Sequence, residues 1–165
     1  MTHPTVRSFM SDDFSRYVAL MNYLKETLPL DKQPAPELIV GPSPRFASVA
    51  LNEHRMVGAA VITASYNPYG MYGTLDNVVR NPDDKYKGIG PDVVNHAITC
   101  AFARGAYAVK LICKDNPDPN EPHGQALRKF YKRFGFLAMD EVPEKERQIV
   151  MRLDRERWLK LQNEG

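Results

Sequence analysis

Residues 75–94, with the sequence LDNVVRNPDDKYKGIGPDVV, change in character from strand to turn to helix within a short stretch. The residues at 75–79 have strand composition, the Asn-Pro-Asp-Asp cluster at 81–84 is typical of a turn, and Gly88 and Gly90 lead into a helical pattern. The first N–H groups of a helix lack intrahelical partners and lie at the positive end of the helix dipole. Lys85 and Lys87 add positive charge beside them. The stretch therefore predicts an anion site.

The bulk properties of the chain indicate one soluble domain. A chain of 165 residues can bury roughly two thirds of its unfolded surface. Hydrophobic residues make up 43% and charged residues 25%, and a net charge of +2 gives no basis for nucleic-acid or membrane partners. The N-terminus has no apolar core of a signal peptide, and no apolar run approaches the roughly 18 residues of a membrane span. We expect a cytoplasmic protein.

The cysteines and acidic residues do not form a metal-site pattern. Cys100 and Cys113 lie in apolar surroundings, which favours core packing in a reducing compartment over a disulfide framework or a zinc site. Residues 115–124 carry three acidic residues, but three prolines break the calcium-ligand spacing and the glycine of the sharp turn is absent. We therefore expect no metal.

The chain before the anion stretch predicts a strand, a helix and a hairpin. Residues 5–9 form the strand, and Ser11 is a helix N-cap. The helix ends before Pro29 and buries an apolar face made of Phe14, Tyr17, Val18, Met21, Leu24 and Leu28. Residues 29–44, with five prolines, read either as a linker or as a wall of a substrate cleft. Residues 46–51 and 56–64 are paired strands, followed by a tyrosine-rich loop at 66–73.

The chain after the anion stretch predicts a parallel crossover and an antiparallel end. The helix that starts at the glycine loop stops at Gly105, and residues 107–113 form a strand parallel to 75–79. A loop at 115–124 leads to a helix at 125–133, which Gly135 terminates. Residues 136–139 and 148–153 pair antiparallel, and a last helix lies within 154–163.

Three phosphate-binding motifs use a glycine loop of this kind, and two of them do not fit. The Walker pattern requires Gly-Lys-Ser/Thr, whereas Gly90 is followed by Pro91 and Asp92. The dinucleotide motif requires three spaced glycines and an early βαβ unit. The remaining possibility is an acyl-coenzyme A loop, in which the pyrophosphate lies on a helix N-terminus.

Residues 75–90 resemble motif A of the GNAT N-acetyltransferase superfamily, whose loop Gln/Arg-x-x-Gly-x-Gly/Ala falls on Lys85, Gly88 and Gly90. The segment FYKRFGF at 130–136 is similar to a second landmark of the family. The resemblance covers 5–153 and implies a single GNAT domain over 1–165 with an extra C-terminal helix at 154–163. It also implies an α/β (α+β) fold whose mixed central sheet of about six to seven strands is flanked by helices, and acetyl-CoA as the acyl donor.

The chain departs from the family pattern at several places. Lys85 replaces the usual arginine or glutamine and so lacks a planar two-donor fork, and Tyr86 stands where the family often has a glycine. The loop at 115–124 is longer and richer in proline than usual, and the asparagine often found before the last helix is not evident.

The resemblance implies roles for individual residues. The expected cofactor-binding residues are Asn77, Val78, Val79, Lys85, Tyr86, Lys87, Gly88, Ile89 and Gly90. The strand residues hold the pantetheine arm, and a backbone N–H of Val78 or Val79 meets the oxyanion if the strand bulges.

Two side chains are the main catalytic candidates. Asp76 is the first candidate for the general base that deprotonates the amine, although it could instead be a strand-end carboxylate paired with a cation. His123 and Glu121 are weaker candidates. Tyr131 matches the family's general acid for the departing thiolate, and the alternative is that it packs beside Phe130 and Phe134.

We therefore predict direct transfer of an acetyl group to a primary amine in a ternary complex. A binding protein that keeps the fold and acts on a partner by contact is the alternative, and transfer of a longer acyl chain is a third case. Two acceptor classes stay open, a small amine or amino acid and a protein lysine or N-terminus. Trp158 either serves a homodimer or covers the core of its own chain.

Overall fold

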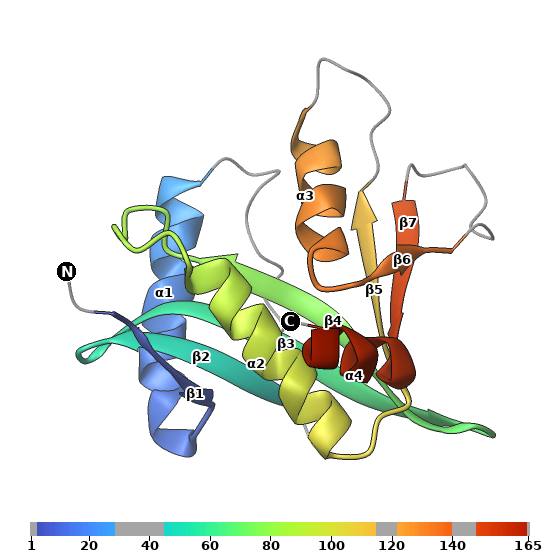
Figure 1. The fold of residues 1–165 in the computed structure, drawn as a ribbon. Helices are drawn as coiled ribbons and strands as arrows, with labels where there is room; N and C mark the ends of the chain where they lie inside the picture. The colour runs from blue at the N-terminus through green and yellow to red at the C-terminus, as the bar shows by residue number, and fades with distance from the viewer. Residues whose placement is uncertain (1–2, 29–44, 115–121, 140–147, 165) are drawn as a thin grey trace. The chain divides into compact units, whose positions relative to one another are not determined.

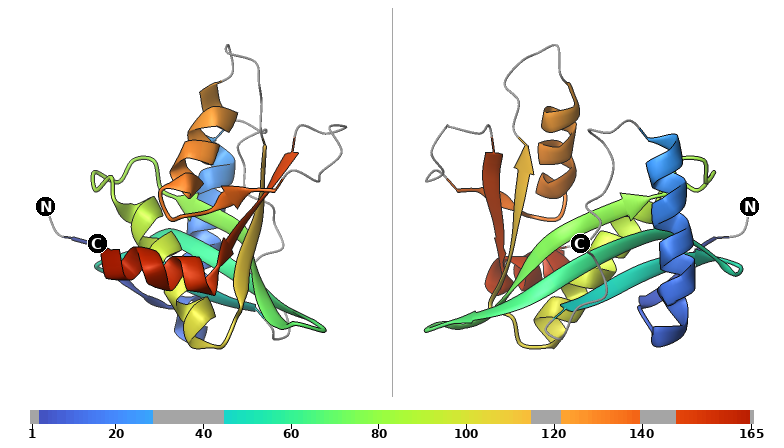
Figure 2. Two further views of the ribbon diagram at one scale, coloured as in Figure 1. Left: turned by 45° about the vertical axis from the view of Figure 1, so that its right-hand side comes forward. Right: turned by 180° about the vertical axis from the view of Figure 1, so that it is seen from behind.

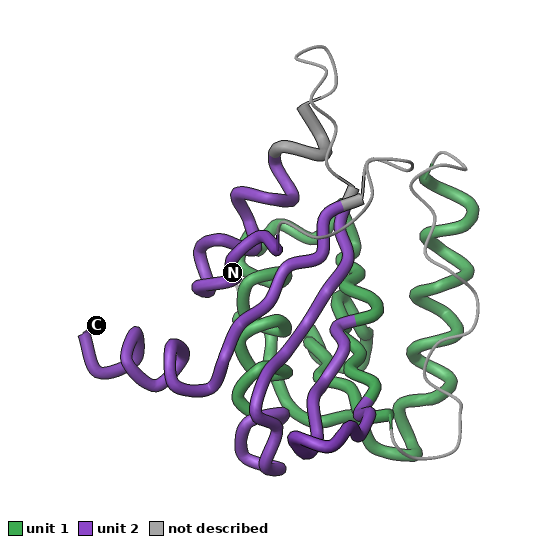
Figure 3. The backbone as a smooth tube through the Cα atoms, turned by 90° about the vertical axis from the view of Figure 1, so that its right-hand side faces the viewer, with its two compact units in different colours: residues 1–63, 76–100 green, residues 64–75, 101–165 purple. Residues whose placement is uncertain are grey.

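The computed structural model describes residues 3–28, 45–114, 122–139 and 148–164. The predictions for residues 29–44 and for Glu121 lie outside these ranges. The chain divides into two compact units, one made of residues 1–63 and 76–100 and the other of 64–75 and 101–165 (Figure 3). Two long strands run through both units. The prediction of one domain over 1–165 stays a prediction.

Seven strands form one sheet in the order β1-β2-β3-β4-β5-β7-β6 (Figure 1). Their bounds are β1 Thr5–Ser8, β2 Arg45–Asn52, β3 Arg55–Asn67, β4 Gly70–Arg80, β5 Ala108–Lys114, β6 Leu137–Ala138 and β7 Gln148–Asp154. The β4–β5 pair is parallel, while β1–β2, β2–β3, β5–β7 and β6–β7 are antiparallel. The helices are α1 Phe14–Thr27, α2 Ile89–Ala103, α3 Pro122–Lys132 and α4 Arg155–Glu164, with a 3-10 turn η1 at Ser11–Asp13. The predicted mixed α/β sheet of six to seven strands is confirmed.

In the first unit, α1 packs on one face of the β2–β3 hairpin. Its buried residues are Tyr17, Leu20, Met21 and Leu24, which cluster with Val49, Met56 and Ala59. The prediction was wrong for Phe14 and Val18, which are 46% and 38% exposed. Both residues lie beside the buried face of α1. Leu20 belongs to that face, because it lies three residues after Tyr17 and four before Leu24, the spacing that one helix face requires.

Ser11 was also predicted wrongly as the helix N-cap. It lies inside η1, and α1 begins only at Phe14, after Asp13. The Asp13 carboxylate is used by neighbouring donors instead of by the first N–H groups of α1.

The helix α2 lies on the opposite face of the same hairpin. Successive strand residues point to opposite faces, so Gly58 and Ala59 face different sides. Ala59 belongs to the cluster under α1, whereas a Cβ placed on Gly58 would overlap the side chain of Ile89 at the start of α2. The glycine is what allows α2 to approach the sheet this closely. Figure 2 shows the two helices from further directions.

In the second unit, the predicted tyrosine loop at 66–73 is mostly strand. The strand β3 continues to Asn67 and β4 begins at Gly70, so only Pro68 and Tyr69 lie between them. The Asn67 side chain accepts a hydrogen bond from the Tyr69 N–H at 2.9 Å, and Gly70 has a φ of 121°, which favours glycine. The predicted loop is therefore a tight hairpin turn, and the other residues of the segment belong to β3 and β4.

The remaining elements of the second unit follow the prediction closely. The parallel pairing of β4 with β5 is confirmed, with Gly73 opposite Val109, and so is the antiparallel β6–β7 pair. The helix α3 begins at Pro122 and not at 125, so His123 is part of it. Trp158 is 6% exposed and its ring lies 6.1 Å from that of Phe102, so it covers the core of its own chain. Within the described ranges, no helix is both long and apolar enough to cross a membrane.

Candidate active site

The strand β4 loses its regular alternation between Asp76 and Val79. Asp76 accepts a hydrogen bond from the hydroxyl of Thr63 on β3. Thr63 and Ala59 are four residues apart in a regular part of the β2–β3 ladder, so their side chains lie on the same face of β3. Val79 clusters with Ala59 under α1. Two residues three positions apart therefore point to one face, which requires an extra residue between them. These two contacts indicate a β-bulge between Asp76 and Val79, and a bulge generally leaves backbone groups of the strand unpaired.

The turn after β4 is held by its own side chains. The Asn81 N–H donates to the Val57 carbonyl at 2.8 Å, and the Asn81 side-chain oxygen accepts the Asp83 N–H at 3.0 Å. One Asp84 oxygen accepts the Tyr86 N–H at 3.0 Å. Asn81 and Asp84 are 4% and 9% exposed, so both act as buried braces of the turn. The sequence pattern marked these residues as a turn and did not indicate that they support the glycine loop.

The glycine loop meets α2 at a fixed position. The side chain of Ile89 is fully buried over Gly58, and the Asp92 N–H donates to the Gly88 carbonyl at 3.0 Å, so Gly88 is the N-cap residue. Lys85 and Lys87 are exposed beside this helix start. The Ile89 and Gly90 N–H groups at the helix start precede the first i−4 bond of α2, and two exposed cations lie beside them. That arrangement suits the pyrophosphate of coenzyme A.

The Tyr86 side chain packs against the glycine loop, beside Gly88 and Asp92. Its hydroxyl donates to the Asp92 carboxylate at 3.0 Å, and its ring lies 4.2 Å from that of His3. A Cβ at Gly88 would come within 2.6 to 2.9 Å of the Tyr86 phenol. Tyr86 therefore fills the space that a side chain at 88 would need.

Asn77 carries an unsatisfied donor next to the bulge. Its amide nitrogen is buried and has no hydrogen-bond partner among the described residues. A buried donor without a partner costs about 1–3 kcal/mol, so a ligand carbonyl at this position would be favoured. The amides of a pantetheine arm supply such carbonyls, and Asn77 therefore fits the predicted role.

Tyr131 lies in the second unit, on α3. Its ring contacts Phe130 and Phe136 edge-on, with centroids 5.0 and 6.0 Å away. Burial, with a smaller contribution from Cys113, raises the pKa of the Tyr131 phenol to about 12. The phenol therefore stays protonated at neutral pH, as a general acid must, although its packing also matches the alternative interpretation.

A strand that runs into a basic glycine loop and a helix start, on a mixed sheet of this order, is the arrangement expected of an acyl-coenzyme A-dependent acetyltransferase. The model of the acetyltransferase (GNAT) family matches residues 7–136, so the chain belongs to the GNAT acetyltransferase family. The resemblance predicted from residues 75–90 and 130–136 is confirmed at the level of the family. No curated protein sequence matches the chain.

Solved structures show the same fold at low identity. A GNAT-family acetyltransferase from Desulfovibrio desulfuricans has a TM-score of 0.69 and 16% identity, with 92% of this chain and 99% of that chain covered. An aminoglycoside 6'-N-acetyltransferase solved with coenzyme A has a TM-score of 0.67 and 16% identity, with 91% and 96% covered. The ribosomal-protein-S18-alanine N-acetyltransferase of Escherichia coli has a TM-score of 0.63 and 16% identity, with 92% and 94% covered. All three chains are matched over nearly their full length.

Proposed function

We propose that the protein transfers the acetyl group of acetyl-CoA to a primary amine by direct attack in a ternary complex. The observation that carries the proposal is that β4, with the inferred bulge, runs into the braced glycine loop and the start of α2, because a strand bulge and a helix N-terminus are places where backbone N–H groups lack ladder or helix partners. Membership of the GNAT family and a related fold solved with coenzyme A support the choice of donor.

The proposed reaction begins with the loss of a proton from the ammonium form of the acceptor. A free amine with a pKa near 10 is mostly protonated at neutral pH, so a carboxylate or a chain of waters should accept its proton. Asp76 is the proposed base, since it is exposed and its recorded partner is the hydroxyl of Thr63 and not a cation. The neutral amine then attacks the thioester carbon, and an N–H of Val78 or Val79 at the bulge stabilises the oxyanion.

The proposed reaction ends with cleavage of the C–S bond, when the thiolate takes a proton from Tyr131. An ordinary thiol has a pKa of about 8.5, so transfer from a phenol of pKa about 12 would be uphill by about 3.5 pKa units. Burial raises the pKa of the phenol, and it would also raise the pKa of a thiol in the same surroundings. The difference between the two pKa values is then smaller than about 3.5 units. The positively charged nitrogen left by the attack of the amine gives its extra proton to the tyrosinate, which yields the neutral amide, and Asp76 releases the first proton to solvent.

The acceptor is proposed only as a primary amine. The similar structures include an enzyme named for an aminoglycoside and one named for the alanine of a ribosomal protein, so the fold serves both small and protein amines. A small amine or amino acid and a protein lysine or N-terminus both stay open for this chain.

The test is release of coenzyme A thiol from acetyl-CoA in the presence of amino acids, polyamines, aminoglycosides and lysine-containing peptides. We expect at least one amine to raise thiol release above background hydrolysis, and Tyr131→Phe to lower kcat by about a hundredfold. Tyr69→Phe, at a residue 86% exposed in the β3–β4 turn, is the matched control and should leave kcat unchanged. Binding of acetyl-CoA without thiol release for any amine, and without an effect of Tyr131→Phe, would favour a binding protein.

A further inference from the structure

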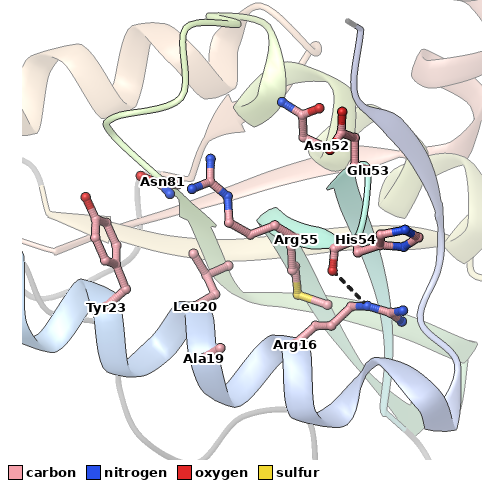
Figure 4. A pocket seen from close by; sticks show the side chains of 10 residues that line it. Arg16, Ala19, Leu20, Tyr23, Asn52, Glu53, His54, Arg55 and Asn81 are labelled. Atoms are coloured by element: carbon pink, nitrogen blue, oxygen red, sulfur yellow. Dashed lines mark hydrogen bonds between the residues drawn. The ribbon is translucent and has the colours of Figure 1, made fainter.

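A pocket of about 690 Å³ lies in the first unit between α1 and the β2–β3 turn (Figure 4). Its apolar wall includes Leu20 and Met56, which are almost fully buried. Polar side chains line the rest, and in Figure 4 the Arg55 side chain extends across the pocket toward Asn81. The polar lining consists of Arg16, Tyr23, Asn52, Glu53, His54, Arg55 and Asn81.

The pocket is not suited to the amine acceptor of the proposed reaction. Asp76 lies five residues before Asn81, which along a strand corresponds to about 17 Å. Arg16 and Arg55 are each paired with a carboxylate outside the lining, Asp13 and Asp84, so the separation from Asp76 is what sets this pocket apart. The pocket is therefore a second site.

The donors in the pocket suit a carboxylate. The Arg55 side chain is 68% exposed, and its ion pair with Asp84 is a loose one, with 3.8 Å between the guanidinium nitrogen and the carboxylate oxygen. The Asn81 side-chain oxygen accepts the Asp83 N–H of the loop, so the Asn81 amide nitrogen is the donor that this side chain offers at the pocket wall. A planar guanidinium binds a carboxylate with two parallel hydrogen bonds, and the Leu20 and Met56 side chains can hold an apolar body.

The same residues are connected to the glycine loop. The Asn52 amide donates to one Asp84 oxygen at 3.4 Å, and Arg55 pairs with that oxygen. The other Asp84 oxygen holds the Tyr86 N–H, and the Asp84 N–H donates to the Asn81 carbonyl at 3.3 Å. Asp84 thus contacts two pocket residues, Asn52 and Arg55, with one carboxylate oxygen and the loop with the other.

We propose that this pocket binds a small organic carboxylate with an apolar body, and that its occupancy weakens the binding of acetyl-CoA. The bound carboxylate draws the Arg55 guanidinium away from Asp84, so the turn at 81–86 loses a brace and the loop is less preorganised for a pyrophosphate. The effect on acetyl-CoA rests on the proposed function, whereas binding of the carboxylate does not.

Phenylacetate is the probe, and phenylacetamide, which has the same shape without the charge, is its control. We expect phenylacetate to shift the amide NMR signals of residues that line the pocket, and phenylacetamide to bind at least tenfold more weakly. Arg55→Gln should weaken phenylacetate binding at least tenfold. Arg45→Gln makes the same charge change at the far end of β2, about 23 Å along the strand from Asn52, and should leave the binding unchanged.

Coupling is measured by titrating acetyl-CoA calorimetrically with and without saturating phenylacetate at constant ionic strength. We expect affinity at least threefold weaker with phenylacetate in the wild type and no difference in Arg55→Gln, and acetyl-CoA should weaken phenylacetate by the same factor. Equal binding of phenylacetate and phenylacetamide, or an unchanged or tighter acetyl-CoA affinity, would overturn the proposal. Absence of acetyl-CoA binding under all conditions would contradict the proposed function instead.

Discussion

Asp13 is the most heavily bonded carboxylate in the described part of the chain. It accepts two hydrogen bonds from the Arg7 guanidinium at 2.6 and 2.8 Å, one from the Met10 N–H at 2.9 Å and one from Arg16 at 3.2 Å. It is fully buried, and its hydrogen bonds from Arg7 hold the pKa of the carboxyl below its usual value. These bonds join β1 to the start of α1. The sequence does not indicate this role of Asp13, because its partner Arg7 is six residues away on another element.

Asp13→Asn should destabilise the protein in a pH-dependent way. The folded pKa of Asp13 is depressed, so its contribution to stability is fully present above the unfolded pKa of about 3.9 and is lost as pH falls through the lower folded pKa. Loss of one partner from a buried ion pair costs roughly 3 kcal/mol at pH 7. Urea unfolding at pH 7 and pH 3 measures the difference, with Asp12→Asn, at an exposed neighbour, as control. An equal loss at both pH values would contradict the assignment.

The pH dependence of the reaction should reflect the raised pKa of Tyr131. Because burial raises this pKa to about 12, the phenol stays protonated through pH 10 and its ionisation cannot reduce the rate there. We expect kcat to rise as the base ionises and then to stay level between pH 8 and pH 10. A fall in kcat with an apparent pKa near 10, absent from Tyr131→Phe, would show that the phenol is less buried in the working enzyme than in this structure.

At the scale of elements, the strand–loop–helix unit at 75–94 was the most predictable part of the chain. Its glycines, turn residues and apolar residues each favour the same structure, so local and global preferences agree. The β3–β4 hairpin was missed because Tyr66, Tyr69 and two glycines suggested a loop, whereas tyrosine also favours strands and the actual turn needs only Pro68 and Tyr69. The position of the bulge depends on side-chain pairing across strands, which the sequence of one strand does not contain.

Gly58→Ala should disturb both stability and donor binding. The added methyl group would overlap Cγ2 of Ile89 and lie 3.3 Å from the Val79 carbonyl, and a buried β-branched side chain cannot rotate away freely. We expect a loss of about 1–3 kcal/mol in unfolding free energy and weaker acetyl-CoA binding, because the start of α2 must move.

Gly105→Ala is the control, because it also adds a methyl group to a glycine but nothing lies within 4 Å of a Cβ at that position. Its loss of stability should come from the backbone strain at a φ of 97° and not from a side-chain overlap. Thermal unfolding with and without acetyl-CoA separates the two effects. A Gly58→Ala protein with reduced stability and wild-type affinity would show that the position of Ile89 does not matter for the loop.

At the scale of the whole molecule, the family, and with it a coenzyme A-type donor, could be predicted from sequence, and the acceptor could not. Two landmarks, at 75–90 and 130–136, fix the family because backbone donors and a glycine loop require particular residues at particular spacings. An acceptor cleft has no such fixed pattern, and one of its predicted walls, residues 29–44, lies outside the described residues. The pocket beside Arg55 was also missed, since its lining comes from α1, the β2–β3 turn and Asn81, which are distant in sequence.

The central claim is that residues 85–90 hold the pyrophosphate of acetyl-CoA. Gly88→Glu places a carboxylate there, but any side chain at 88 also meets the ring of Tyr86, so Gly88→Gln is needed as a control of equal size without the charge. Calorimetric titration of acetyl-CoA into the wild type and both variants tests the claim directly. We expect both variants to bind more weakly than the wild type, and Gly88→Glu at least tenfold more weakly than Gly88→Gln. Equal affinities for Gly88→Glu and the wild type would contradict the account.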